Sequence, residues 1–136
     1  MSAGNAPRLS YEAAFEANPI SASQARRFVS KHLFNHGLPY LVNPVRLVAS
    51  ELVTNALLHA NTAFHVTLSI SDEAVLLTVR DDSLSLPSRR AAQATDTTGR
   101  GLEIVDIVSL DWGVRTDSEG SKAVWASFSI RDAQQF

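Results

Sequence analysis

The chain has 136 residues, of which 45% are hydrophobic and 19% charged, with a formal net charge of −2 and no cysteine. This composition fits one globular domain with a single core, and it excludes disulfides and zinc–thiolate sites. The 12 basic residues are scattered and no apolar run reaches membrane-spanning length, so we expect no direct nucleic-acid binding and no membrane insertion. The lack of cysteine is compatible with a cytoplasmic location.

The first part of the chain predicts an edge strand and a helix. Residues 1–8 read as a disordered leader, and residues 9–17 have the weak pattern of an edge strand. Ser21 and Gln24 have the spacing of a capping box, in which Ser21 is the N-cap and Gln24 bonds back to it. The helix is predicted to end at Gly37, which can adopt the left-handed conformation of a C-terminal stop.

Two histidines, His32 and His36, lie one turn apart on this first helix. A metal site needs further ligands, and none is evident near them in the sequence. We therefore expect them to form a pair at the edge of the core.

A second helix, opened by Asn43 as N-cap and Pro44 in the first turn, carries the most informative residues. Glu51, Asn55 and His59 follow one another at intervals of four, so they stack along one side of this helix, next to its apolar face. A carboxylate and an amide oxygen one turn apart suit a hard cation such as Mg²⁺, or an acid–base pair beside one. An ordinary solvated polar edge is the alternative.

The second half of the chain predicts further strands and one more helix. Residues 64–70 alternate between apolar and polar side chains, and residues 74–81 form a second strand that pairs with them as a hairpin. Residues 83–98 are polar and without a period, and loops of this length are usually functional or mobile. A helix over 102–110, strands over 111–116 and 123–130, and a tail over 131–136 complete the chain.

Grouped helices and locally paired strands predict an α+β fold. We expect a two-layer sandwich, with three helices on one face of a mixed sheet of about five strands. A doubly wound parallel fold would require a helix between most strands, which this order does not provide. Residues 9–130 would form this single domain.

The strand over 74–81 ends in Asp81, which Asp82 and Ser83 follow. A carboxylate at a strand end can face a cavity and accept two hydrogen bonds, which suits an exocyclic amine such as that of adenine. The alternative is that these three residues only begin the loop, because Asp and Ser favour turns.

Gly99-Arg100-Gly101 precedes the predicted third helix. Exposed backbone N–H groups at glycines and the partial positive charge of a helix N-terminus together cradle phosphate oxygens. Glycines that merely close a loop are the alternative. The chain has no P-loop pattern, and no strand directly precedes these glycines, so neither a P-loop nor a Rossmann site is expected.

The order of these motifs resembles that of the GHKL-type ATPases, which include gyrase, MutL and histidine kinases. The residues that carry the resemblance are 51–60, the strand end at Asp81, 99–102 and 112–114. They are most similar to the small bacterial branch of anti-sigma factor serine/threonine kinases (RsbW/SpoIIAB-like). The resemblance covers about residues 9–130 and implies the Bergerat-type ATP-binding fold.

The resemblance implies roles for the residues of the second helix and the strand end. Asn55 would be a magnesium ligand, and Glu51 would be the general base that takes a proton from a substrate hydroxyl or from water. His59 would line the phosphate end of the pocket. Asp81, with Ser83 beside it, would read the adenine amine.

The resemblance also implies a triphosphate site, with ATP and Mg²⁺ as cofactors. The loop 83–98 would be the ATP lid. The residues expected at the phosphates are Gly99, Gly101 and Leu102, through their backbone, and Arg89, Arg90 and Arg100, through their charge.

The function that the resemblance implies is partner switching in the regulation of transcription. The protein would bind ATP and a sigma factor, and it would phosphorylate a serine or threonine of an anti-anti-sigma (STAS-type) antagonist, which makes it a serine/threonine protein kinase. A homodimer is left open. The alternative is a non-catalytic ATP-binding module, in which the nucleotide sets the choice of protein partner.

Two positions depart from the family pattern. Ser83 stands where the family usually has a glycine, two residues after the adenine aspartate. Ala123 stands where many relatives have a threonine that supports this aspartate, and the loss of that hydrogen bond, worth about 1 kcal/mol, would weaken ATP binding. Ser121 is the nearby hydroxyl that could replace it.

Overall fold

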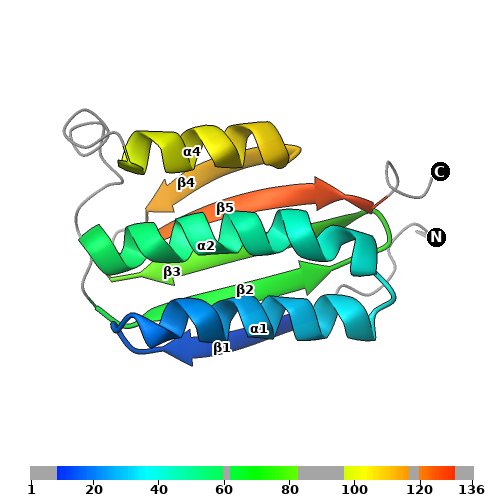
Figure 1. Cartoon of the computed structure of the whole chain (residues 1–136), viewed down its shortest axis with the longest axis horizontal. Helices are drawn as coiled ribbons and strands as arrows, with labels where there is room; N and C mark the ends of the chain where they lie inside the picture. The colour runs from blue at the N-terminus through cyan, green and yellow to red at the C-terminus, as the bar shows by residue number, and fades with distance from the viewer. Residues whose placement is uncertain (1–8, 60–61, 83–96, 117–119, 131–136) are drawn as a thin grey trace.

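The computed structural model describes residues 9–59, 62–82, 97–116 and 120–130. In this part of the chain three α-helices lie over one face of a five-stranded sheet, which confirms the predicted α+β sandwich of two layers (Figure 1). Among the same residues no helix is long and apolar enough to cross a bilayer. The expected leader 1–8, residues 83–96 of the expected lid and the tail 131–136 lie outside the described residues.

The described elements follow the predicted order along the chain. They are β1 (Leu9–Phe15), α1 (Ile20–Asn35), a 3₁₀ turn (Pro39–Leu41), α2 (Val42–His59), β2 (Phe64–Ile70), β3 (Ala74–Asp81), α4 (Thr97–Val108), β4 (Asp111–Thr116) and β5 (Lys122–Ser129). Helix α2 starts directly after the 3₁₀ turn, so Asn43 and Pro44 lie inside its first turn, and the prediction of Asn43 as N-cap was wrong.

The described strands pair only in antiparallel fashion, in the order β1-β2-β3-β5-β4. The prediction of a mixed sheet was therefore wrong. The single helix α4 makes β3 and β4 run in the same direction (Figure 1), but β5 lies between them and pairs with both. Two helices separate β1 from β2, so the chain reverses three times between these neighbouring strands, and they are antiparallel.

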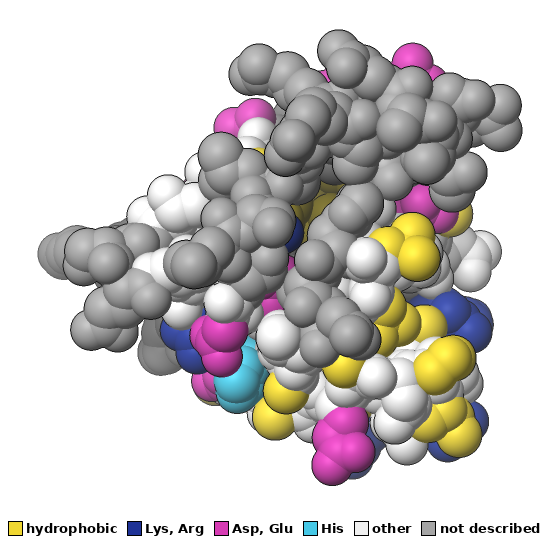
Figure 2. Space-filling view, turned by 90° about the vertical axis from the view of Figure 1, so that its left-hand side faces the viewer, with side chains coloured by type: hydrophobic (Ala, Val, Ile, Leu, Met, Phe, Trp, Pro, Cys, Tyr) yellow, Lys and Arg dark blue, Asp and Glu magenta, His cyan; other side chains and the backbone are white. Residues whose placement is uncertain are grey.

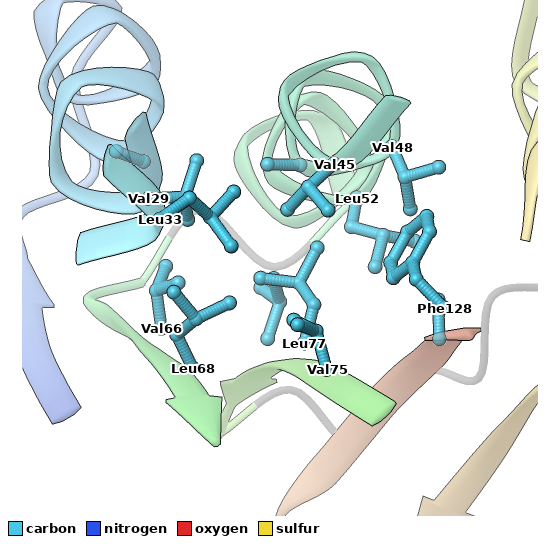
Figure 3. Packing of buried hydrophobic residues seen from close by; sticks show 14 of the residues in the cluster. Val29, Leu33, Val45, Val48, Leu52, Val66, Leu68, Val75, Leu77 and Phe128 are labelled. Atoms are coloured by element: carbon cyan, nitrogen blue, oxygen red, sulfur yellow. The ribbon is translucent and has the colours of Figure 1, made fainter. Parts of the chain in front are cut away.

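The core lies between the sheet and the helices. Alternate residues of β2, β3 and β5 are buried, as the alternation of 64–70 predicted for β2, and these side chains meet the inner faces of α1 and α2 (Figure 3). The residues labelled there are Val29, Leu33, Val45, Val48, Leu52, Val66, Leu68, Val75, Leu77 and Phe128. This continuous apolar layer fixes α2, and with it the polar residues of α2, against the sheet.

The start of α1 differs from the predicted capping box. The helix begins at Ile20, with Pro19 at the N-cap and no hydrogen bond from a capping side chain. The hydroxyl of Ser21 is buried and donates a hydrogen bond to the carbonyl of Glu16 over 2.7 Å. It therefore pairs a backbone group of the segment before the helix and does not cap the N-terminus of the helix. At the other end the predicted stop is confirmed, because Gly37 has a φ of 72°.

Truncation of a central core residue should destabilise the fold strongly. Leu77 on β3 is fully buried, so Leu77→Ala removes apolar contacts and leaves a cavity, and we expect a loss of about 2–5 kcal/mol in the free energy of unfolding. Urea denaturation measures this loss. Leu58→Ala is the matched control, because this leucine on α2 is 62% exposed, and a loss as large as that of Leu77→Ala would contradict the assigned core.

Two histidines join β1 to α1 at the rim of this core. The ring of Tyr11 stacks on His32 with centroids 3.9 Å apart, and the Tyr11 hydroxyl lies 2.6 Å from Nε2 of His36. The prediction that the two histidines form a pair at the edge of the core is confirmed. Burial, together with the positive charge of Lys31 and of His36, lowers the pKa of His32.

This lowered pKa predicts a loss of stability at acidic pH. Below the ordinary value of 6.5 the unfolded chain takes up a proton that His32 in the folded protein resists, so the full stability is present above that pH and declines as the pH falls through it. Urea unfolding between about pH 5 and pH 8 measures the slope. His32→Gln should flatten it, and an unchanged slope would assign the pH dependence to other groups.

Candidate functional site

Helix α2 holds Glu51 and Asn55 at the interface of the two layers. Asn55 is only 9% exposed, and Glu51, one turn earlier, is half-buried. Helix α2 packs against both β3 and α4, so Asn55 is enclosed by packed elements. The alternative of a fully solvated polar edge is therefore excluded for Asn55. His59 is the last residue of α2.

Asp81 is the last residue of β3 and is 2% exposed. It shares the alternation phase of the buried residues Leu77 and Val79, so its side chain lies on the helix side of the sheet. A carboxylate that is so deeply buried is costly unless it is paired, which argues against a residue that only begins a solvated loop. The ammonium of Lys122 lies 3.6 Å from Oδ2 of Asp81.

The predicted site residues that the structure describes lie towards one end of the molecule. Figure 1 shows that the carboxyl ends of α2 and β3 and the amino ends of α4 and β5 lie at the same end of the sandwich. Figure 2 views the molecule from this end and shows a hollow in which acidic, basic and hydrophobic side chains are visible. The fold thus brings the end of α2, Asp81 and the start of α4 together although they are far apart in the sequence.

Lys122 is a residue of this site that the motifs did not reveal. It is the first residue of β5, directly opposite Asp81 in the strand register, and it is 3% exposed. The signal that could have found it is alternation, because Lys122 has the same phase as the buried residues Val124 and Ala126. A lysine in the core phase of a strand is almost never buried without a partner.

Ala123 lies on the other face of the sheet. There it lines a hollow of about 380 Å³ together with Thr78 and Arg80. Because consecutive strand residues point to opposite faces, Ala123 does not occupy a position that could support Asp81, and the expectation placed on it was wrong. The hydroxyl of Ser121 lies 3.4 Å from an oxygen of Asp82.

Helix α4 begins earlier than predicted, at Thr97 instead of residue 102. Gly99 therefore falls among the first residues, whose N–H groups have no partner within the helix, whereas Gly101 lies further inside the helix. Their phosphate contacts, and those of Leu102, stay predictions. Ser83, Arg89 and Arg90 lie outside the described residues, and of Arg100 only the helical backbone is described.

The comparison with protein families decides the kind of domain. The model of the histidine kinase-like ATPase domain matches residues 15–128, which include Glu51, Asn55 and Asp81. The chain belongs to this family. The resemblance to the GHKL-type ATPases is thereby confirmed, and such an ATPase domain implies ATP binding. The search of curated proteins finds no match.

The described residues of the histidine kinase-like ATPase domain fit a nucleotide with a magnesium ion. The buried carboxylate of Asp81 has the acceptor oxygens that an exocyclic amine requires. Within the described residues no cluster of three or more His, Cys, Asp or Glu side chains could hold a metal. Asn55 as a single protein ligand still suits Mg²⁺, because this ion keeps several waters and binds phosphate oxygens.

Proposed function

We propose that the protein is an ATP-binding anti-sigma factor that also acts as a serine/threonine protein kinase on an anti-anti-sigma (STAS-type) antagonist. The observation that carries the proposal is the half-buried Glu51, one helical turn before the buried Asn55, with Asp81 buried at the same end of the fold. Membership of the ATPase family supports ATP binding, and Glu51 supplies a base, which binding alone does not require.

In the proposed reaction a serine or threonine hydroxyl of the antagonist attacks the terminal phosphorus of ATP. Glu51 takes the hydroxyl proton while the new O–P bond forms, and ADP departs with the electron pair of the broken P–O bond. Asn55 would hold the magnesium ion, which supplies neutralising charge when bound. Asp81 accepts a hydrogen bond from the exocyclic amine of adenine. The products are ADP and the phosphorylated antagonist.

The triphosphate is held by residues at the amino end of α4 and by the lid. The N–H group of Gly99, which has no partner within α4, donates to a phosphate oxygen, because a helix N-terminus attracts anions. Gly101 and Leu102 lie further inside α4, so the phosphate contacts expected of their N–H groups rest on the family resemblance alone. His59 lies at the phosphate end, and Ser83 follows the adenine aspartate. The lid arginines, Arg89 and Arg90, and Arg100 contribute positive charge.

The proposed setting is the bacterial cytoplasm, with residues 9–130 acting as one domain. The protein partners are a sigma factor and the STAS-type antagonist, and neither nucleic acid nor membrane takes part directly. Whether the protein acts as a homodimer is left open. Phosphorylation of the antagonist adds close to two negative charges, which changes its fit to the anti-sigma factor and so switches partners.

Phosphotransfer to candidate antagonists tests the proposal. The purified protein is incubated with radiolabelled Mg-ATP and STAS-domain proteins, and mass spectrometry locates the phosphate. We expect phosphate on a serine or threonine of one antagonist, and retention of a sigma factor by the protein in pull-down experiments. A protein that binds ATP but labels none of the antagonists would lose the kinase half of the proposal and would favour the non-catalytic module.

A further inference from the structure

Lys122 stands beside the residue proposed to read the base, and no step of the proposed reaction uses it. It opens β5 and lies across from Asp81, on the side of the sheet that faces the helices. The chain has two lysines, and Lys31, the other one, is exposed on α1. The burial of Lys122 is thus specific to its place and not a general property of lysines in this protein.

The contact between Lys122 and Asp81 does not use the full hydrogen-bonding capacity of either side chain. The distance of 3.6 Å between Nζ and Oδ2 is longer than the 2.7–2.9 Å of a charge-assisted hydrogen bond. An ammonium has three donors and a carboxylate has about four acceptor sites, so neither group is exhausted by the other. Both side chains are almost fully buried, at 4% and 2% exposure, where hydrogen bonds to a ligand are stronger than in water.

Together the two side chains present a hydrogen-bond donor next to an acceptor. The amide of Asn or Gln offers the same combination, and it reads adenine by accepting from the exocyclic amine while donating to the neighbouring ring nitrogen. Asp81 is suited to the first of these contacts and Lys122 to the second. The matched pattern on adenine consists of N6 with either N1 or N7, because these two ring nitrogens flank the amine.

We propose that Lys122 is a second base-reading residue. Its ammonium donates a hydrogen bond to one ring nitrogen of adenine, next to the amine from which Asp81 accepts a hydrogen bond. This inference rests on the proposed function, because it places the adenine at Asp81. It makes Lys122 a determinant of base specificity, whereas a purely structural role would limit it to balancing the charge of Asp81. The two roles differ in one measurable respect, since only a base-reading residue distinguishes nucleotides that differ by a single ring nitrogen.

Calorimetric titration of ATP, 1-deaza-ATP and 7-deaza-ATP tests the assignment without any activity measurement. Against the wild-type protein, one of the two analogues is expected to bind about 10–150-fold more weakly than ATP, because it lacks the acceptor for a charge-assisted hydrogen bond. In Lys122→Met this difference should shrink to less than about threefold. Lys31→Met is the matched control and should keep the full difference.

The removal of Lys122 leaves Asp81 without its cation, so a second variant guards against unfolding. Lys122→Thr keeps a hydroxyl donor for Asp81 but has no ammonium that reaches a base. If wild type binds both analogues as tightly as ATP, or if the difference persists in either variant, the inference is overturned while the proposed function stands. If wild type binds no ATP at all, both the inference and the proposed function fail.

Discussion

Asp81→Ala is expected to abolish detectable ATP binding. The substitution removes the acceptor for the adenine amine, and each charge-assisted hydrogen bond lost from a buried site weakens binding by about 10–150-fold. The amine would also enter the pocket unpaired, which adds a desolvation cost. Isothermal titration calorimetry with Mg-ATP measures the effect, and unchanged affinity would show that the base does not lie at Asp81.

Asp81→Ala also leaves the ammonium of Lys122 buried without its partner, so the fold must be checked. Breaking a buried ion pair from one side costs about 3–5 kcal/mol, which a thermal melt would reveal. Asp81→Asn retains the shape of the side chain and carries the binding test if the alanine variant unfolds. Asp82→Ala is the matched control, because Asp82 is the next residue and is exposed, and it should bind ATP like the wild type.

Glu51→Gln is expected to reduce phosphotransfer to the antagonist by about 10²–10⁴-fold, because glutamine has nearly the same shape but cannot accept the hydroxyl proton. ATP affinity should change little, because a general base acts on the attacking hydroxyl and not on the bound base or sugar. Single-turnover assays with radiolabelled ATP measure the rate, and calorimetry measures the affinity. Loss of both together would assign Glu51 to nucleotide binding and not to catalysis.

Glu73→Gln provides the control for Glu51→Gln. Glu73 lies in the turn between β2 and β3, at the other end of the sheet, and it is exposed (Figure 1). The Glu73→Gln variant should transfer phosphate at the wild-type rate. If Glu51→Gln also transfers phosphate at the wild-type rate, the proposed role of Glu51 as the base is wrong. If neither the wild type nor Glu51→Gln transfers phosphate but both change protein partners with ATP, the non-catalytic module is correct.

The sequence identified the local parts of this fold because their signals are local. The alternation of 64–70 predicted β2, since a strand with one buried face must repeat every second residue, and the turn after it predicted β3 as its hairpin partner. The spacing of Glu51 and Asn55 placed both on one side of α2, because helical geometry depends only on neighbours in the chain. Motif order then led to the correct family.

Other predictions failed where the orientation or the hydrogen bond of a side chain depends on residues outside its own segment. Ser21 looks like a helix cap, but its burial lets it bond the carbonyl of Glu16 instead. Ala123 was expected to stand beside the base-reading aspartate, yet a shift of one residue along a strand moves a side chain to the opposite face. The sequence motif showed which segment lies near Asp81, but it did not show which residues of β5 face the helices.

The amino-acid sequence alone determined the order of the helices and strands, the polar strip of α2 and the carboxylate at the end of β3, because each depends on contacts within a few residues. Only the tertiary structure decided that β5 inserts between β3 and β4, and this insertion makes the sheet antiparallel and sets Lys122 against Asp81. The physical reason is that the pairing of β3 with β5 joins segments that are about 40 residues or more apart in the sequence, and the choice among such pairings depends on how well the whole core packs.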